Sequence, residues 1–198
     1  MIFNYNSRIN FHRLLNLINI KKLEILDFGC GRGIWLEKAL KNKKLNKIVL
    51  YDENIKLIPI LKKKYSSRKI KINFNLKNIL EKEDFNLIIF SSVIQYMKKD
   101  YLEKLIRNLV KNKKKLFIVI TDIPFLPRPF ELLLMPFLNL KRFLYVLQFI
   151  FLKDYKKLNY QTYKKDDFKF LKNKFKLKFT SNFHDLNYLR YSLILELK

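Results

Sequence analysis

The chain has 198 residues, of which 49% are hydrophobic and 15% aromatic, so it is too apolar for a disordered protein and long enough to bury a core as one domain. Its 42 Lys and Arg residues against 17 Asp and Glu residues give a formal net charge of +25, which would attract phosphates, anionic lipid or other acidic partners. Because the excess is mostly lysine and Ala39 is the only alanine, we attribute much of this charge to a compositional bias of the genome rather than to a nucleic-acid site.

The cysteine content and the N-terminal residues predict a cytoplasmic protein. Cys30, the single cysteine, cannot form an internal disulfide, and the first residues lack the charged-then-apolar layout of a signal peptide. The longest apolar stretch, Leu132 to Leu152, is divided by Pro136 and a Lys-Arg pair into halves too short to span a membrane. An alternative is that this stretch lies along the inner face of a membrane.

Strand-like and helix-like segments alternate from the N-terminus to Thr121, a pattern typical of a doubly wound α/β sheet that is mostly parallel. Ligands of such sheets bind at the carboxyl ends of the strands. The predicted strands are Leu23 to Phe28, Lys47 to Tyr51, Lys69 to Phe74, Phe85 to Phe90 and Leu116 to Thr121. The predicted helices are Asn10 to Ile20, Ile34 to Leu40, Ile55 to Tyr65, Asn78 to Glu81 and Val93 to Val110.

The pattern changes after Asp122, where four prolines fall between residues 124 and 136. We interpret residues 123–163 as an insertion, helical beyond Phe130, that forms a lid within a single domain of residues 1–198. A last helix is predicted over Asp166 to Phe175. Lys176 to Thr180 and Tyr188 to Leu197 then predict an antiparallel hairpin at a sheet edge, which makes seven strands in all.

All three glycines lie within five residues, at positions 29, 31 and 33, between the first predicted strand and the helix after it. Glycine allows backbone to approach a ligand closely, and amide groups at the start of a helix offer hydrogen-bond donors to it. The alternative is a tight structural turn. The dinucleotide fingerprint G-x-G-x-x-G does not fit, because its last position falls on Ile34 or Leu36.

The sequence Ile25-Leu26-Asp27-Phe28-Gly29-Cys30-Gly31-Arg32-Gly33 resembles the first motif of class I S-adenosylmethionine-dependent methyltransferases of the small-molecule type. The resemblance implies a Rossmann-like methyltransferase fold with S-adenosyl-L-methionine as cofactor. It also implies that the motif lies under the methionine part of the cofactor, with Asp27 near its amino group. The motif residues assigned to cofactor binding are Asp27, Phe28, Gly29, Cys30, Gly31 and Gly33.

Further cofactor contacts are expected where later strands end. By the same resemblance Asp52 accepts hydrogen bonds from both ribose hydroxyls, as an ionised carboxylate can, and Glu53 is a weaker candidate for that contact. Asn78 and Ile79 stand where many members have an acid that holds the adenine amine, although a helix-capping role for Asn78 is an equal alternative. Ser91 begins a segment, Ser91 to Met97, that resembles the one after strand four in small-molecule members.

The methyl acceptor is not readable from the sequence. The segment after strand four lacks the Asn/Asp-Pro-Pro-aromatic tetrapeptide of exocyclic-amine methyltransferases, which disfavours base-amine methylation but leaves other RNA methylation open. We expect a small-molecule, glycan or lipid-linked acceptor. The alternatives are an RNA methyltransferase that uses the basic surface and a non-catalytic cofactor-binding interaction module. No metal site and no obligate protein partner are expected.

Two residues are candidates for a general base if the acceptor is a hydroxyl. Asp122 follows strand five, where a turn-capping role is an equal alternative, and His184 lies in the predicted hairpin turn, where an ordinary surface histidine is the alternative. Tyr96 and Gln95 are candidates to line the acceptor pocket. The Cys30 thiol is interpreted as a packing group rather than a nucleophile.

Overall fold

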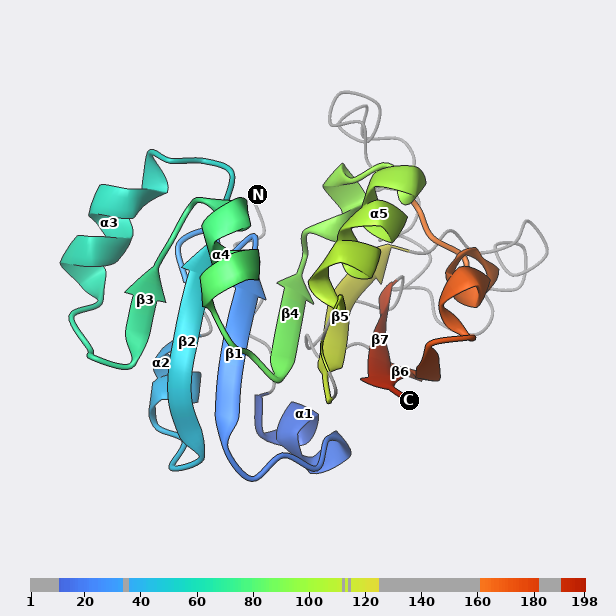
Figure 1. Ribbon diagram of the computed structural model, residues 1–198, viewed down its shortest axis with the longest axis horizontal. Coiled ribbons are helices and arrows are strands. Elements are labelled where there is room, and N and C mark those ends of the chain that lie inside the picture. The colour runs from blue at the N-terminus through green and yellow to red at the C-terminus, as the bar shows by residue number, and fades with distance from the viewer. Residues whose placement is uncertain (1–10, 34–35, 112, 114, 125–160, 182–189) are drawn as a thin grey trace, which may run out of the picture.

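A computed structural model describes residues 11–33, 36–111, 113, 115–124, 161–181 and 190–198. Its centre is a seven-stranded sheet in the order β3-β2-β1-β4-β5-β7-β6 (Figure 1). The strands are β1 Leu23–Phe28, β2 Leu45–Tyr51, β3 Ile70–Ile72, β4 Leu87–Ser91, β5 Phe117–Pro124, β6 Phe175–Ser181 and β7 Arg190–Leu197.

The strand pairing confirms the predicted α/β class and the C-terminal hairpin. The first five strands pair in parallel, whereas β7 lies antiparallel between β5 and β6. All eight residues of β5 are buried, as are all but Ser91 in β4, because the central strands are covered on both faces.

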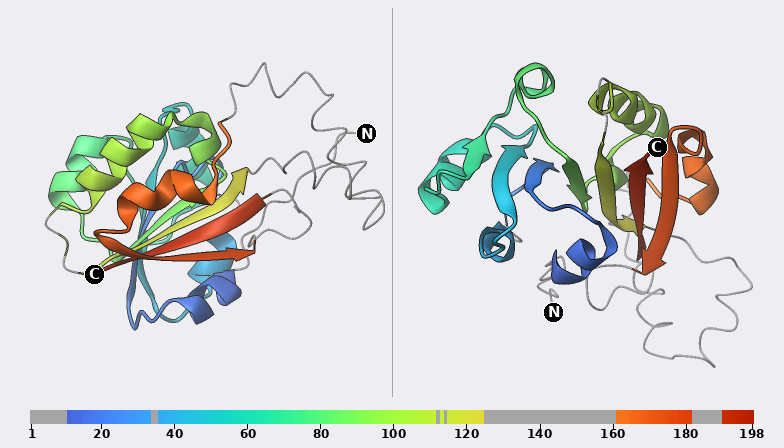
Figure 2. Two further views of the ribbon diagram at one scale, coloured as in Figure 1. Left: turned by 90° about the vertical axis from the view of Figure 1, so that its right-hand side faces the viewer. Right: turned by 60° about the horizontal axis from the view of Figure 1, so that its bottom comes forward.

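Helices lie on both faces of the sheet, and Figure 2 (left) shows α5 and η2 on the opposite side from α1 and α2. Neighbouring residues of a strand point to opposite faces, so Ile25 belongs to the core under α1 and α2, and Leu26 belongs to the core under α5 and η2. The helices are α1 Phe11–Leu17, α2 Leu36–Leu40, α3 Leu57–Lys64, α4 Leu76–Lys82 and α5 Lys99–Leu109, with 3-10 turns η1 Ile94–Tyr96 and η2 Lys165–Leu171.

The single long helix predicted over Val93 to Val110 is wrong. Met97 and Lys98 have extended backbone and separate η1 from α5. The break is stabilised from a distant part of the chain, because the Tyr163 hydroxyl shares its single proton between the carbonyl oxygens of Met97 at 2.7 Å and Ile94 at 3.2 Å. A pattern of apolar residues along one segment carries no information about such a donor.

Two boundaries near the C-terminal third also differ from the prediction. Ile123 and Pro124, which we assigned to the insertion, are the buried end of β5, where Pro124 pairs with Arg190. The predicted last helix is the 3-10 turn η2, and Phe175 already begins β6. The lid hypothesis and its membrane alternative concern residues 125–160, which lie outside the described residues and stay predictions. Within the described part of the chain, no helix combines the length and apolarity needed to cross a membrane.

Candidate functional site

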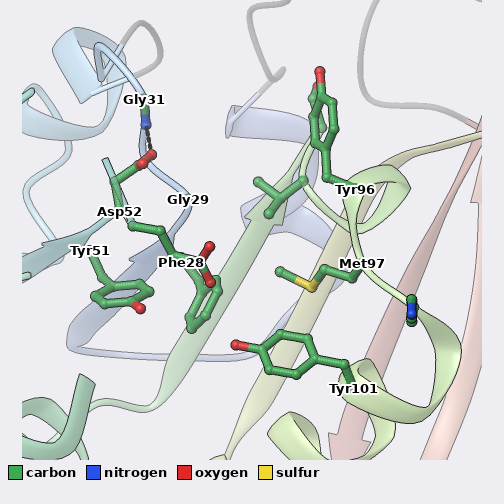
Figure 3. Close-up of a pocket in the computed structure, with 12 residues that line it drawn as sticks. Phe28, Gly29, Gly31, Tyr51, Asp52, Tyr96, Met97 and Tyr101 are labelled. Carbon is green, nitrogen blue, oxygen red and sulfur yellow. Dashed lines mark hydrogen bonds between the residues drawn. The ribbon is translucent and has the colours of Figure 1, made fainter. Parts of the chain in front are cut away.

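A cavity of about 720 Å³ opens where β1, β2 and β4 end, at the carboxyl edge of the sheet (Figure 3). Its volume lies in the range of small-molecule binding sites. It is lined by Phe28, Gly29, Gly31, Tyr51, Asp52, Glu53, Ser92, Val93, Tyr96, Met97, Lys98 and Tyr101.

The glycine loop after β1 is fixed to the end of β2 by backbone hydrogen bonds. The amides of Gly29 and Cys30 both donate to the Tyr51 carbonyl oxygen, at 2.8 and 2.9 Å. The Gly31 amide donates to Asp52 Oδ2 at 2.9 Å, and the Asn54 amide donates to Asp52 Oδ1 at 2.9 Å. Each carboxylate oxygen of Asp52 thus has a fixed position beside Gly31 and keeps acceptor capacity for a ligand.

The three glycines stand in different surroundings. A Cβ at Gly29 would lie 2.5 Å from Val93 Cγ2, and one at Gly33 would lie 2.6 Å from Leu36 Cδ1 and 3.0 Å from the Tyr65 ring. A Cβ at Gly31 would meet no atom of the described residues within 4 Å, its two chain neighbours aside. Protein packing therefore demands glycine at positions 29 and 33, whereas the space in front of Gly31 is open on the cavity side.

The comparison with known proteins agrees with this geometry. Residues 5–157 match the family described as "Methyltransferase domain". The chain belongs to this family. Members of this family use S-adenosyl-L-methionine as their cofactor.

Individual relatives of this methyltransferase are distant. The chain is 27% identical over 114 residues to ribosomal RNA small subunit methyltransferase A of Mesomycoplasma hyopneumoniae strain 232, a match that covers 56% of this chain and 42% of the relative. The magnesium protoporphyrin IX methyltransferase of Synechocystis PCC 6803, solved with bound S-adenosylhomocysteine, has a TM-score of 0.59 at 15% identity, covering 93% of this chain and 78% of that protein. A methyltransferase of Methanosarcina mazei has a TM-score of 0.60 at 15% identity, over 93% and 96% of the two chains. At such identities the structural likeness shows the fold alone.

The cavity brings together five of the residues predicted to bind the cofactor: Phe28, Gly29, Gly31, Asp52 and Glu53. The other six are not among its lining residues, and their roles toward the cofactor stay predictions. Asp27, Cys30, Gly33 and Ile79 are buried, and Ser91 is the last residue of β4. The capping alternative for Asn78 is wrong, because the Asn75 side chain is the N-cap of α4 and accepts from the Asn78 amide at 3.1 Å.

Burial controls the chemistry of Cys30 in this methyltransferase. Burial raises the pKa of the Cys30 thiol, and the negative charges of Asp27 and Asp52 raise it further. The side chain is 7% exposed and belongs to the core under α1 and α2. Such a thiol is protonated and unreactive at neutral pH, as expected for a packing group.

Sequence reasoning missed the far wall of the cavity, formed by residues between β4 and the first turn of α5. Tyr96 was anticipated there, but Met97, Lys98 and Tyr101 fell within the single helix predicted over Val93 to Val110 and had no role in the site. Gln95, the other anticipated residue, is buried behind the lining and accepts a hydrogen bond from Arg190. No local signal marked this wall, because Ile94, Met97 and Tyr101 keep helical spacing across the break.

Two tyrosines line the cavity near Glu53: Tyr51 ends β2, and Tyr101 lies in the first turn of α5. The pKa of Tyr101 is raised by burial and by the nearby Glu53 carboxylate. Burial raises the pKa of Tyr51 to about 12, with a further contribution from Glu53. Both phenols are therefore neutral hydrogen-bond donors across the physiological range, and neither serves as a base.

Asp122 lies behind the cavity in a buried polar cluster. Its Oδ2 accepts from Ser92 Oγ at 2.7 Å and from Arg190 at 3.2 Å, and Arg190 also donates to the Asp122 carbonyl oxygen at 2.9 Å. Ser92 and Asp122 both have left-handed backbone, with φ of 57° and 63°, a conformation that costs free energy in residues other than glycine. Asp122 is thus connected to the cavity through Ser92, and its role as a base stays a prediction. His184 lies outside the described residues.

Proposed function

We propose that this methyltransferase transfers the methyl group of S-adenosylmethionine to a small-molecule, glycan or lipid-linked acceptor, with a small molecule as the first candidate. The observation that supports it most directly is the Asp52 carboxylate, which the Gly31 and Asn54 amides hold at the edge of the cavity. An acid fixed there suits two neighbouring ribose hydroxyls, and the open space at Gly31 suits close approach of a ligand to backbone.

Residues of this chain would hold the cofactor and align the acceptor. Gly29 and Gly31 would support the methionine part, and Asp52 would accept from the ribose hydroxyls. Phe28, Tyr51 and Met97 give the cavity apolar surface on both sides. S-adenosylmethionine, when bound, supplies a methyl group on a sulfonium centre that is already electrophilic. The protein therefore contributes mainly by proximity and orientation.

A hydroxyl acceptor would need a base, and the structure suggests a route for its proton. Ser92 lines the cavity and donates to Asp122 Oδ2, so Ser92 Oγ would accept the acceptor's proton while its own proton passes to Asp122. Arg190 would hold the carboxylate in place during this transfer. An acceptor nitrogen with a free lone pair would not need this route.

Calorimetric titration with S-adenosylhomocysteine tests the cofactor assignment. Asp52→Ala removes two charge-assisted hydrogen bonds to the ribose, so we expect binding to weaken roughly ten- to hundredfold. Asp84→Ala is the matched control, because it removes the same charge from an exposed site away from the cavity. No binding by the wild type at millimolar ligand would refute the cofactor site, and equal affinity in both variants would refute only the role of Asp52.

Methylation of RNA is a second candidate function, favoured by the net charge of +25 and by the similarity to a ribosomal RNA methyltransferase. Incubation with radiolabelled cofactor and separate RNA and small-molecule fractions of a cell extract distinguishes the two candidates. Label in the small-molecule fraction supports the first proposal. Label in RNA alone would replace it by the second.

A further inference from the structure

The cavity has two chemically different ends (Figure 3). Asp52 and Glu53, directly after β2, make one end acidic. The opposite wall, which follows β4, is lined by a lysine between two tyrosines, and Asp100 of the same segment does not line the cavity. Because the acidic end suits the ribose hydroxyls of the cofactor, the opposite wall is the part of the cavity left for the acceptor. This inference therefore rests on the proposed cofactor site.

Lys98 supplies the positive charge of that wall. It stands in extended backbone immediately before α5, its side chain is exposed, and it lines the cavity. Among the described residues Lys98 takes part in no ion pair, whereas the adjacent Lys99 pairs with Asp167 at 2.8 Å. A lysine ammonium in this position acts as a compact point charge that binds carboxylate or phosphate.

The residues beside Lys98 provide aromatic and apolar surface. Tyr96 is 59% exposed and Tyr101 is 42% exposed, and both line the cavity. Met97 lies between η1 and α5 with its side chain directed to the same space (Figure 3). Tyrosine rings stack on flat groups, and a methionine side chain adapts to irregular apolar shapes.

We propose that the acceptor is a small molecule with a flat apolar body and a compact anionic group, carboxylate or phosphate, and that Lys98 binds this anionic group. The body of the acceptor packs against Tyr96, Met97 and Tyr101. The acidic end of the cavity excludes the reverse orientation, because Asp52 and Glu53 would repel an anion there.

Pairs of charged and neutral probes test the proposal without knowledge of the natural acceptor. We would titrate isotope-labelled protein, saturated with S-adenosylhomocysteine, with benzoate against benzamide and with phenyl phosphate against phenol, and follow binding by NMR. The comparison uses Lys98→Gln and Lys104→Gln. Lys104 is an exposed residue of α5 that does not line the cavity. Both variants lower the net charge by one, so the general attraction of a basic protein for anions changes equally in both.

We expect wild type and Lys104→Gln to bind at least one anion about three- to tenfold more tightly than its neutral partner, and Lys98→Gln to lose this preference. If the Lys98-dependent preference is seen for benzoate alone, the anionic group of the acceptor is a carboxylate. If it is seen for phenyl phosphate alone, the anionic group is a phosphate. Equal preferences in the two variants, or no preference in the wild type, would overturn the proposal. A Lys98-dependent affinity for oligouridylate with neither small anion bound would also overturn it, in favour of RNA.

Failure of the proposed function is recognised separately in the same experiment. S-adenosylhomocysteine is titrated first, and all three proteins should bind it with equal affinity. If the wild type does not bind it, the cofactor site is wrong. If it binds and the anion preference is absent, only the acceptor inference is wrong.

Discussion

Gly31 is the position at which an added side chain should disturb ligand binding much more than folding. All three glycines of the loop have positive φ, but only at Gly31 is the space of the missing Cβ empty of protein atoms. At Gly33 that space is filled by Leu36 and Tyr65, and the Tyr65 hydroxyl donates to the Gly33 carbonyl oxygen at 2.5 Å. The same substitution should therefore have different effects at the two positions.

Gly31→Ala should impair cofactor binding by more than tenfold while costing only about 1 to 2 kcal/mol of unfolding free energy, the cost of left-handed backbone. Gly33→Ala adds the overlap with Leu36 and Tyr65, so its cost should be about 2 to 5 kcal/mol. Urea unfolding and S-adenosylhomocysteine titration measure the two quantities. If Gly31→Ala binds as the wild type does, the open space in front of this residue is not ligand space.

The Cys30 thiol should react with iodoacetamide roughly a hundredfold more slowly in the folded protein than in urea at pH 8. Its burial and the neighbouring carboxylates raise its pKa, so the reactive thiolate is scarce. Because Cys30 is the only cysteine, whole-protein mass spectrometry reports its modification directly. Alkylation of native protein at the unfolded rate would show that the glycine loop opens readily.

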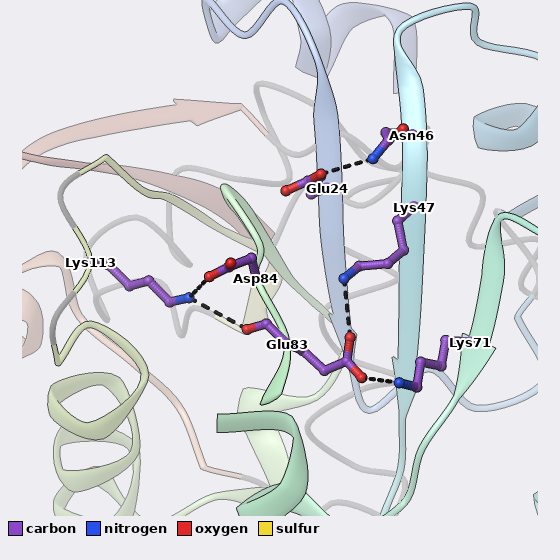
Figure 4. Close-up of polar contacts among 7 residues, drawn as sticks. All are labelled: Glu24, Asn46, Lys47, Lys71, Glu83, Asp84 and Lys113. Carbon is purple, nitrogen blue, oxygen red and sulfur yellow. Dashed lines mark hydrogen bonds and ion pairs between the residues drawn. The ribbon is translucent and has the colours of Figure 1, made fainter. Parts of the chain in front are cut away.

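Among the secondary-structure elements, the connection from α4 to β4 is tied to β2 and β3 by a charged cluster (Figure 4). Glu83, 4% exposed, pairs with Lys47 of β2 at 3.0 Å and with Lys71 of β3. The next residue, Asp84, pairs with Lys113 but is 91% exposed. Burial alone would raise the pKa of Glu83, but hydrogen bonds from Lys71 and Lys47 outweigh it and hold the pKa below its usual value of 4.5.

Glu83→Gln should lower the unfolding free energy at pH 7 by about 1 to 2 kcal/mol, less than for a fully buried pair, because both lysines are partly exposed. Since the folded pKa is lowered, this contribution is complete above pH 4.5 and is lost as the pH falls through the folded value. The difference between wild type and variant in urea unfolding should thus shrink at acidic pH. Asp84→Asn, the exposed control, should leave stability unchanged at pH 7. A pH-independent difference would contradict the ionic role of Glu83.

At the scale of the whole molecule, the net charge of +25 opposes compactness. Few carboxylates are available to offset it, and several of those in the described residues are already paired with lysine or arginine. The remaining cations are solvent-exposed, so salt screens the repulsion among them. The partly buried ion pairs of Glu83 are screened less.

Raising sodium chloride from 20 to 300 mM should raise the melting temperature by roughly 2 to 4 °C, equivalent to about 1 kcal/mol for a chain of this size. Differential scanning fluorimetry without ligand measures it. A melting temperature that falls with salt would show that specific ion pairs outweigh the general repulsion.

The sequence by itself determined the features that depend on neighbouring residues. Apolar runs interrupted by turns predicted the seven strands along the chain, and the glycine cluster with Asp52 predicted residues that line one side of the cavity. These signals are local, because strand and helix periods and glycine's small size act over a few residues.

Tertiary structure alone decided the features that depend on distant partners. Tyr163 satisfies the carbonyl oxygens at the break before α5, and this break places Lys98 and Tyr101 on the cavity wall opposite Asp52. Arg190 of β7 likewise places Asp122 in a buried cluster rather than at the cavity surface. Such contacts join residues tens of positions apart, and their free energy exceeds the weak local preference for a continuous helix, so no periodic pattern reveals them.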